Sequence, residues 1–449
     1  MRTLLINPGI HDFAAYDLWN RPLGLVRVGG LLRAWGWETE LLDFLDRSHP
    51  ALAEIPPGTR GRDDPYGCGK YVREEIPLPR ALSNFPRRYF RYGLPPHLAG
   101  NDLAGREKPD LILVGSGMTY WYSAVRETVE LARTAFPGVP LILGGTYARL
   151  LPGHALRECR PDLVQEGAGA GSLAASLEKL DFPAPRRPEN GEAPPAWDLI
   201  GDRRALPVQL TRGCPFACPY CAAGRLEGKW RGGDPLETAR EVLDLHEKWG
   251  TVDFAFYDNA LLVGAENNLD PFLESLAGRG LRLHAPNSLH ARLLRPITAV
   301  LMKEAGFITI RLSLETSQPD LQRRLGGKAG NADLKRAAGV LEKAGFDRSR
   351  VGVYTILGFP GQKPKQVEAD ISFVHSLGLQ VVLAAFSPIP GTPVYGELEE
   401  EKRIPGDPLF TNNTVFPSLG REFPVPEIRR LRQLAAEKNR ALAGNDEAV

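Results

Sequence analysis

The sequence lacks several features that would define whole classes of protein. None of its apolar runs approaches the roughly 18 residues needed to span a bilayer, so no membrane span is expected. Lysine and arginine together number 55 against 54 acidic residues, which leaves a formal net charge of +1 and no general attraction for nucleic acid. The first residues, MRTLLINPG, do not contain the apolar core of a secretory signal. We therefore expect a cytoplasmic protein.

Cysteine is scarce, and its placement is uneven. Five cysteines in 449 residues are too few for a disulfide framework. The eight histidines are scattered and form no metal-binding pattern. Cys68 and Cys159 stand alone, whereas Cys214, Cys218 and Cys221 lie within eight residues. This crowding of three thiols is the strongest indication of function in the sequence.

The length and the order of the predicted elements indicate an α/β protein with more than one domain. At roughly 150 residues per domain, the chain is long enough for two or three. Up to residue 181, short apolar runs alternate with helix-like segments, as in a parallel sheet covered by helices on both faces. The strand-like runs lie at 3–7, 38–44, 110–115, 140–145 and 162–167, with helices over 22–36 and 122–136. We therefore expect a Rossmann-like, doubly wound sheet over residues 1–181.

Two segments depart from this alternation. Residues 46–108 are rich in proline, glycine and arginine and show little periodicity, so we interpret them as a functional cover rather than a passive loop. Within them, FPRRYFRYG (85–93) interleaves arginine with aromatic residues, which suits either a nucleotide or acidic ligand or a packed cover. Between residues 182 and 206, closely spaced prolines predict an extended linker.

A second β/α series follows the linker. Its strand-like runs lie at 206–211, 252–257, 281–285, 308–315, 350–357 and 379–386. The segments 234–250 and 332–346 have helical spacing and end in glycine or an aromatic residue next to glycine. These units predict a partial (β/α)6 barrel over residues 207–395, short of the closed eightfold barrel. The remaining residues, 396–449, contain an amphipathic helix near 426–443 and are expected to form a helical cap.

The clustered cysteines form a C-x3-C-x2-C loop, RGCPFACPYC, after the first strand of this barrel. Three thiolates on one short loop can hold three irons of a cubane cluster and leave the fourth iron without a protein ligand. Pro215 and Pro219 lack backbone donors, so an irregular loop rather than a helix is expected. A structural zinc site is the alternative, although it needs a fourth ligand from elsewhere in the chain.

This loop, with Tyr220 just before its last cysteine, resembles the signature of the radical S-adenosylmethionine (radical SAM) superfamily. The resemblance implies a 4Fe-4S cluster held by Cys214, Cys218 and Cys221, whose remaining iron binds SAM. It further implies that an external electron donor, such as flavodoxin or ferredoxin, supplies the electron that cleaves SAM to methionine and a deoxyadenosyl radical. Such an enzyme would be oxygen-sensitive.

Other strand ends of the barrel fit the same resemblance. In ITIRLSLET, strand alternation places Arg311, Ser313 and Glu315 on one face, which we expect to point into the barrel. An unpaired charge there is costly, so these residues require either a ligand or an internal Arg311–Glu315 ion pair. Asp258 closes the second strand, where the alternative role is a turn or a helix cap. The residues that the resemblance assigns to SAM are Tyr220, Asp258, Ser313, Glu315 and Ser387.

The N-terminal domain resembles the cobalamin-binding domain that precedes the barrel in one large radical SAM subgroup. The resemblance is carried by PLGLVRVGGLLRAWGWETELLDF, KPDLILVG, VPLILGGTYA and DLVQEGAGAGSL, in that order. Two glycines at a strand end would let a bulky cofactor approach the backbone closely. No D-x-H-x-x-G motif is present, so no histidine ligand to cobalt is expected, and Tyr120 is predicted to lie nearest the metal. The residues assigned to cobalamin are Ser116, Thr119, Tyr120, Gly144, Gly145 and Gly167.

Together these features predict a cobalamin-dependent radical SAM enzyme. As the resemblance implies, we expect a methyltransferase that acts on an unactivated carbon of a small molecule or peptide. One alternative keeps the radical chemistry but performs a rearrangement, cyclisation or oxidation, with cobalamin used otherwise or lost. Another, from a different class, is a non-catalytic zinc- or cobalamin-binding module. Neither a membrane nor nucleic acid is expected as a partner.

Overall fold

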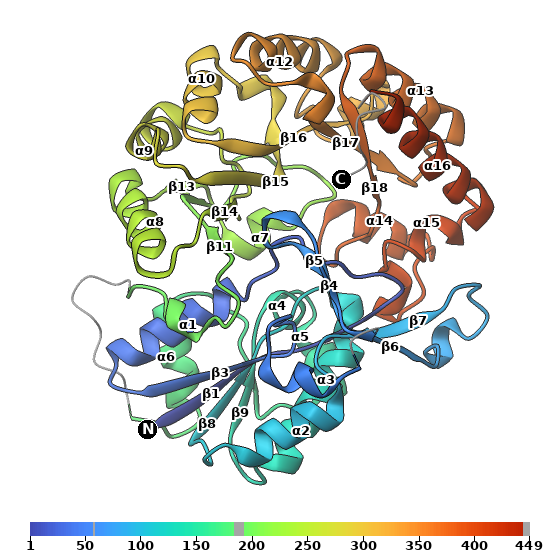
Figure 1. The fold of residues 1–449 in the computed structure, drawn as a ribbon. Helices are drawn as coiled ribbons and strands as arrows, with labels where there is room; N and C mark the ends of the chain where they lie inside the picture. Colours follow the sequence, from blue (N-terminus) through green and yellow to red (C-terminus); the bar gives the residue numbers. More distant parts are fainter. Residues whose placement is uncertain (57–58, 184–192, 443–449) are drawn as a thin grey trace. The chain divides into compact units, whose positions relative to one another are not determined.

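The computed structural model describes residues 1–56, 59–183 and 193–442, and these fall into two compact units (Figure 1). The first unit comprises residues 1–203 together with 407–409, and the second comprises residues 204–406 together with the described residues from 410 onward. The predicted linker, 182–206, lies partly outside the described residues. Its described end packs on the first unit, where the Ala196 N–H donates to the Val26 carbonyl at 2.9 Å.

The first unit is built on a five-stranded parallel sheet in the order β10-β9-β8-β1-β3. Its strands are β1 (Arg2–Asn7), β3 (Glu38–Asp43), β8 (Leu111–Val114), β9 (Leu141–Leu143) and β10 (Leu163–Val164). The helices that accompany it are α1 (Leu23–Ala34), α3 (Tyr122–Ala135), α4 (Thr146–Leu150), α5 (Pro152–Cys159) and α6 (Ala170–Glu178). Because the strands are parallel, their carboxyl ends meet at one edge of the sheet. The predicted α/β class of this region is confirmed.

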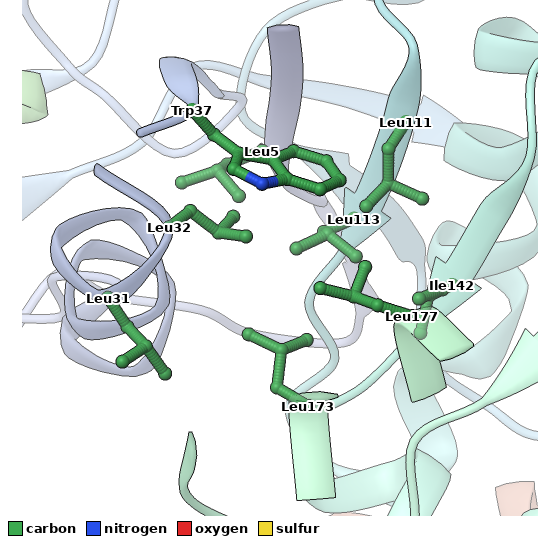
Figure 2. Close-up of a cluster of buried hydrophobic side chains, with 9 residues drawn as sticks. All are labelled: Leu5, Leu31, Leu32, Trp37, Leu111, Leu113, Ile142, Leu173 and Leu177. Carbon is green, nitrogen blue, oxygen red and sulfur yellow. The ribbon is translucent and has the colours of Figure 1, made fainter. Parts of the chain in front are cut away.

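The apolar runs of the sequence form a core between this sheet and helices α1 and α6 (Figure 2). Side chains from three strands face those from the two helices, and the Trp37 indole lies beside them (Figure 2). The buried cluster consists of Leu5, Leu31, Leu32, Trp37, Leu111, Leu113, Ile142, Leu173 and Leu177. Burial of each such side chain contributes about 1.5–3 kcal/mol, which is enough to fix the sheet on its helices.

The predicted cover, residues 46–108, contains short strands and a helix. β6 (Arg73–Ile76) and β7 (Tyr89–Tyr92) form an antiparallel sheet with β2 (Ile10–Asp12). β4 (Arg62–Asp63) pairs with β5 (Gly69–Lys70), and α2 (Pro96–Gly105) leads back to the main sheet. The strands are too short to produce the periodicity that a sequence analysis relies on.

The arginine and aromatic residues of this cover interact with its own neighbours. Arg91 forms an ion pair with Glu127 at 2.5 Å, and the Arg88 guanidinium lies 5.6 Å from the centroid of the Phe90 ring. These contacts favour a packed cover over a free ligand-binding patch. Burial raises the pKa of the Cys68 thiol to about 12, so this cysteine is not a reactive thiolate.

The second unit is built on a six-stranded parallel sheet in the order β11-β14-β15-β16-β17-β18. Its strands are β11 (Ala205–Val208), β14 (Asp253–Phe256), β15 (Arg282–His290), β16 (Phe307–Glu315), β17 (Gly352–Leu357) and β18 (Gln380–Ala385). The connecting helices are α7 (Ala223–Glu227), α8 (Pro235–Trp249), α9 (Leu269–Leu276), α10 (Pro296–Glu304), α11 (Pro319–Arg324), α12 (Asn331–Lys343) and α13 (Pro364–Ser376). In Figure 1, helices α8, α9, α10, α12 and α13 follow the outer side of the curved sheet. The predicted partial barrel is confirmed.

The C-terminal segment packs beside the last strands of this barrel. It forms α14 (Pro393–Glu400), α15 (Phe416–Leu419) and α16 (Val425–Leu442). Leu398, Ile404 and Phe416 join a buried cluster with Ile356 of β17 and Phe386, which directly follows β18. The segment therefore packs on the barrel rather than forming a separate body. No helix in the described part of the chain is long and apolar enough to cross a membrane.

One strand extends well beyond its predicted end. β15 extends to His290, whereas the sequence pattern ends near residue 285. The extension contains Pro286, Asn287 and Ser288, which are residues typical of turns. A register shift lets the strand resume beyond them, with Leu289 opposite Leu312. The extension of β15 is therefore held by its pairing with β16 and not by the strand propensity of its own residues.

Candidate active site

The three clustered cysteines lie on the loop between the short strand β12 (Thr211–Arg212) and helix α7. Cys214 and Cys218 are half-buried, and Cys221 is exposed. The Cys221 N–H donates to the Cys218 carbonyl at 3.1 Å, and the Ala223 N–H points at the Cys221 sulfur at 3.5 Å. The loop is thus held by its own backbone and leaves one cysteine open to solvent.

The charge environment of the thiols indicates what they can bind. Burial raises the pKa of Cys214 and of Cys218, because an ionised sulfur is poorly solvated there. The ammonium group of Lys328 opposes this rise at both thiols. Thiolates at this loop therefore need a cationic partner, which a metal centre supplies.

A cubane cluster and a single metal ion place different requirements on a donor set of three cysteines on one loop. Within residues 1–56, 59–183 and 193–442, no three His, Cys, Asp or Glu side chains are grouped so that they could hold one metal ion. Structural zinc binds its thiolates at about 2.3 Å and requires four ligands to converge on one point. A cubane cluster binds each thiolate through a different iron, so the sulfurs remain apart. The donor set consequently fits a 4Fe-4S cluster.

Asp258, which follows β14, holds the start of the cysteine loop. Its carboxylate accepts hydrogen bonds from the Thr211 N–H at 2.5 Å, the Thr211 hydroxyl at 2.7 Å and the Leu210 N–H at 3.2 Å. The residue is only 3% exposed, and this burial raises its pKa to about 6. Both carboxylate oxygens are therefore engaged within the barrel. These contacts are long-range and are neither a local turn nor a helix cap, and a contact between Asp258 and SAM remains a prediction.

Glu315 ends β16 in a strained backbone conformation. Its φ is +68°, in the left-handed region that costs a non-glycine residue about 1–2 kcal/mol, and the register with β17 shifts between Ser313 and Glu315. Its carboxylate lies 3.7 Å from the Lys328 ammonium. The side chains are only 13% (Lys328) and 15% (Glu315) exposed. The Arg311–Glu315 pair considered above is therefore not the one formed: Lys328 provides the counter-ion.

Lys328 is a site residue that the sequence analysis missed. It follows the Gly326–Gly327 turn, whose residues have φ values of +96° and +61°. A Cβ at Gly326 would lie 3.4 Å from the Cys218 Cα, so this turn runs directly past the cysteine loop. The signal in the sequence is the Gly-Gly pair after a short helix, which marks a left-handed turn but does not reveal what it approaches.

Tyr220 connects the cysteine loop to the end of β16. Its hydroxyl hydrogen-bonds to Glu315, and its ring packs against the buried cluster that contains Phe386 and Phe416. Burial, followed by the negative charges of Glu315 and Cys218, raises the pKa of this phenol well above its ordinary value. Tyr220 therefore stays protonated and acts as a hydrogen-bond donor. The structure brings it together with Glu315, as the predicted SAM site requires.

The two predicted serines point to neighbouring backbone. The buried Ser313 hydroxyl donates to the Leu289 carbonyl at 3.4 Å, and the Ser387 hydroxyl donates to the Thr411 carbonyl at 2.6 Å. Each oxygen retains lone pairs that can accept a hydrogen bond. Their roles toward SAM remain predictions.

His290 is a second residue that the sequence analysis did not assign. Its ring stacks on Phe216 of the cysteine loop, with ring centroids 4.1 Å apart and planes 19° from parallel. Burial lowers the pKa of His290 to about 3, so the imidazole is neutral. The stack supports the loop between Cys214 and Cys218. It became visible only because β15 extends further than predicted.

In the first unit, the predicted cobalamin residues lie at the carboxyl edge of the sheet. The Ser116 hydroxyl donates to the Gly144 carbonyl at 2.6 Å and accepts from the Ala148 N–H at 3.2 Å. Gly145 has a φ of +93°, and a Cβ there would lie 2.3 Å from the Ser116 carbonyl oxygen. Gly145 and Gly167 are exposed. Backbone is therefore exposed at Gly145 and Gly167, beyond the ends of β9 and β10.

The aromatic residues after β8 do not face this edge as predicted. Tyr120 is only 5% exposed, and Thr119 is also buried, so the structure does not support Tyr120 as the group nearest to cobalt. Trp121 donates its indole N–H to Asp12 at 2.6 Å. Met118 is instead the exposed side chain, at 48%. Tyr120 is buried beside the Trp121 ring, with ring centroids 6.0 Å apart, which a run of aromatic residues in the sequence cannot reveal.

Comparison with known proteins identifies the barrel. Residues 208–374 match the model of the radical SAM superfamily. The chain is 25% identical over 357 residues to an uncharacterized methyltransferase of Pyrococcus horikoshii, covering 72% of this chain and 76% of that protein. It is also 29% identical over 182 residues to the anaerobic magnesium-protoporphyrin IX monomethyl ester cyclase of Synechocystis, covering 33% of this chain and 36% of the cyclase.

The fold of both units recurs in a solved structure. The radical SAM methyltransferase TsrM from Kitasatospora setae, with cobalamin and a 4Fe-4S cluster bound, matches with a TM-score of 0.63 and 16% identity. The match covers 89% of this chain and 75% of TsrM. The region that matches the radical SAM superfamily, residues 208–374, contains the three clustered cysteines, Glu315 and Lys328.

Proposed function

We propose that this radical SAM enzyme is a cobalamin-dependent methyltransferase acting on an unactivated carbon of a small molecule or peptide. The observation that carries the proposal is that one chain contains both a three-cysteine loop in the barrel and a sheet edge with three glycines in the first unit. The similarity to a methyltransferase over 72% of the chain supports methyl transfer. The similar fold of cobalamin-bound TsrM supports the second cofactor.

Cys214, Cys218 and Cys221 would hold the 4Fe-4S cluster, which, when bound, supplies the reductive cleavage of SAM. Glu315, at the end of β16, and Lys328, after α11, form an ion pair that is largely shielded from water. There they can bind the charged amino and carboxylate groups of SAM. The electron would come from an external donor protein such as flavodoxin or ferredoxin.

Gly144, Gly145 and Gly167 would hold cobalamin at the edge of the parallel sheet, where it would carry the methyl group. The space beside Gly144 is compatible with a bulky group such as cobalamin. A Cβ at Gly144 would meet only the Gln165 side chain, at 3.6 Å, so the space beside this glycine is open. Ser116 would act indirectly, because its hydrogen bonds to Gly144 and Ala148 fix the shape of the edge.

The experiment uses SAM labelled with carbon-13 in its methyl group. The anaerobically reconstituted protein, loaded with cobalamin and given a chemical reductant, is incubated with labelled SAM and a cell extract. We expect S-adenosylhomocysteine together with a product that has gained the label. Deoxyadenosine as the sole product of SAM, with no label transferred, would contradict methyl transfer.

A second candidate is radical chemistry without methyl transfer. The observation that favours it is the 29% identity to a cyclase, which exceeds the 25% identity to the methyltransferase, although over a shorter stretch. In this case the same incubation yields deoxyadenosine and an unlabelled product changed by ring closure or oxidation. The cobalt content of the purified protein sharpens the distinction, because this candidate allows the cofactor to be absent.

A further inference from the structure

Arg311 lies in the middle of β16, on the strand face it shares with Ser313 and before the register shift that precedes Glu315. It pairs in register with Gly352 of β17. A Cβ at Gly352 would lie 2.5 Å from Nη1 of Arg311 and 2.7 Å from its Cδ. Glycine at this position therefore provides the space that the guanidinium occupies. The neighbouring strand is adapted to an arginine side chain inside the barrel.

This guanidinium has no counter-ion. Across the described residues, Arg311 makes no ion pair and no hydrogen bond, and the nearby carboxylate of Glu315 is paired with Lys328. The polar side chain beside it is Tyr354, whose hydroxyl donates to the Pro286 carbonyl at 3.0 Å. Arg311 is half-buried, and this burial lowers its pKa. A charge in this situation is costly unless a ligand compensates for it.

Other arginines of the same unit are satisfied by the protein. Arg282 forms a hydrogen-bonded ion pair with Asp253, with Nε and Oδ1 2.8 Å apart. Arg336 donates to three carbonyls of the segment after β15, each at 2.8 Å. Arg311 differs from both because its five N–H donors remain available. The fold provides space for the side chain and does not use its charge.

We propose that Arg311 binds an anionic oxygen group of the substrate, a carboxylate or a phosphate, inside the barrel. This assignment rests on the proposed function, because it places the substrate in the radical SAM barrel. Arg311 lies four residues before Glu315, about 13 Å along the strand, so it can serve a ligand other than the one held at the strand end. The planar guanidinium matches both oxyanions through paired hydrogen bonds.

The test compares the full-length reconstituted protein with Arg311→Met, which keeps much of the side-chain volume and removes the charge. Arg282→Met is the matched control, because Arg282 has a counter-ion. The probes are benzoate, its neutral analogue benzamide, and orthophosphate, each titrated while the melting temperature is followed. We expect benzoate or orthophosphate, but not benzamide, to stabilise the wild-type protein, and Arg311→Met to weaken that binding by about tenfold or more.

The choice of anion identifies the substrate group: benzoate alone indicates a carboxylate, and orthophosphate alone a phosphate. Without any probe, Arg311→Met should melt at a higher temperature than wild type, whereas Arg282→Met should melt at a lower one. Anion stabilisation that is absent, or equal in wild type and Arg311→Met, overturns the proposal. A loss of SAM affinity in Arg311→Met also overturns it, because the guanidinium would then serve SAM. Iron and sulfide content, measured on the same samples, tests the proposed function separately.

Discussion

The two units differ in the side chains that they place at the edges of their parallel sheets. In the barrel, side chains supply the chemistry: three thiols, the Glu315–Lys328 pair and the Tyr220 hydroxyl lie around one loop. In the first unit, side chains are withdrawn. Tyr120 is buried and the Ser116 hydroxyl is used to fix Gly144, so the edge offers mainly backbone.

The difference follows from what each edge has to bind. A metal cluster needs thiolate ligands at fixed points, and a charged cofactor needs charged partners. A large cofactor with its own metal and reactive centre needs space and a close approach to the backbone. The edge of the barrel should therefore be sensitive to loss of a side chain, and the edge of the first unit to gain of one.

The largest effect is expected from the cysteines. Replacement of Cys214, Cys218 or Cys221 by serine should remove the cluster, reduce iron and sulfide per chain to background, and abolish SAM cleavage. The control is Cys159→Ser in the first unit, where the buried thiol donates to the Tyr122 carbonyl at 3.9 Å and a hydroxyl can do the same. Wild-type iron content in all three serine variants would contradict the conclusion that side chains supply the chemistry at the barrel edge.

The next effect tests the first edge by adding a methyl group. Gly145→Ala should lower the free energy of unfolding by about 2–4 kcal/mol, because the residue has positive φ and its Cβ would collide with the Ser116 carbonyl. Gly144→Ala makes the same chemical change next door, where the Cβ meets only the Gln165 side chain, and should be nearly neutral. Urea unfolding measures both variants. Equal stabilities would show that the edge is not fixed by its backbone.

Contacts between residues far apart in the sequence set the limit of what the sequence could predict. The cysteine motif and the end of β16 were predictable because chemistry and spacing lie within a few residues. The function of Asp258 depends on Thr211, 47 positions earlier, and the position of Lys328 depends on a turn that passes Cys218. Such contacts are made only by the folded chain. The order of strands and helices was predictable for the same reason as the cysteine motif, since its signal is local.

A smaller effect concerns the stability of the barrel edge as a function of pH. The pKa of buried Asp258 is raised to about 6 in the folded protein, above the ordinary value of 3.8. The folded state therefore binds the proton more tightly. Its contribution to stability is complete below about pH 4 and is lost as the pH rises to about 6. The loss amounts to at most about 3 kcal/mol, from roughly two pKa units at 1.36 kcal/mol each.

The variant Asp258→Asn cannot titrate, so its stability should fall less than that of wild type between pH 4 and pH 6. The measurement is the urea midpoint of both proteins under anaerobic conditions at several pH values. If the urea midpoints of the two proteins change with pH in parallel, Asp258 does not titrate in this range. A smaller fall in the stability of Asp258→Asn than in that of wild type would confirm that this carboxylate is enclosed in the barrel, where it supports the cysteine loop.

The most direct test of the account is electron paramagnetic resonance of the anaerobically reconstituted and reduced protein, recorded before and after addition of SAM. The account predicts about four irons and four sulfides per chain and a cluster spectrum that changes when SAM occupies the iron without a protein ligand. A protein that carries one zinc and no such signal, or a cluster spectrum that SAM leaves unchanged, would contradict it.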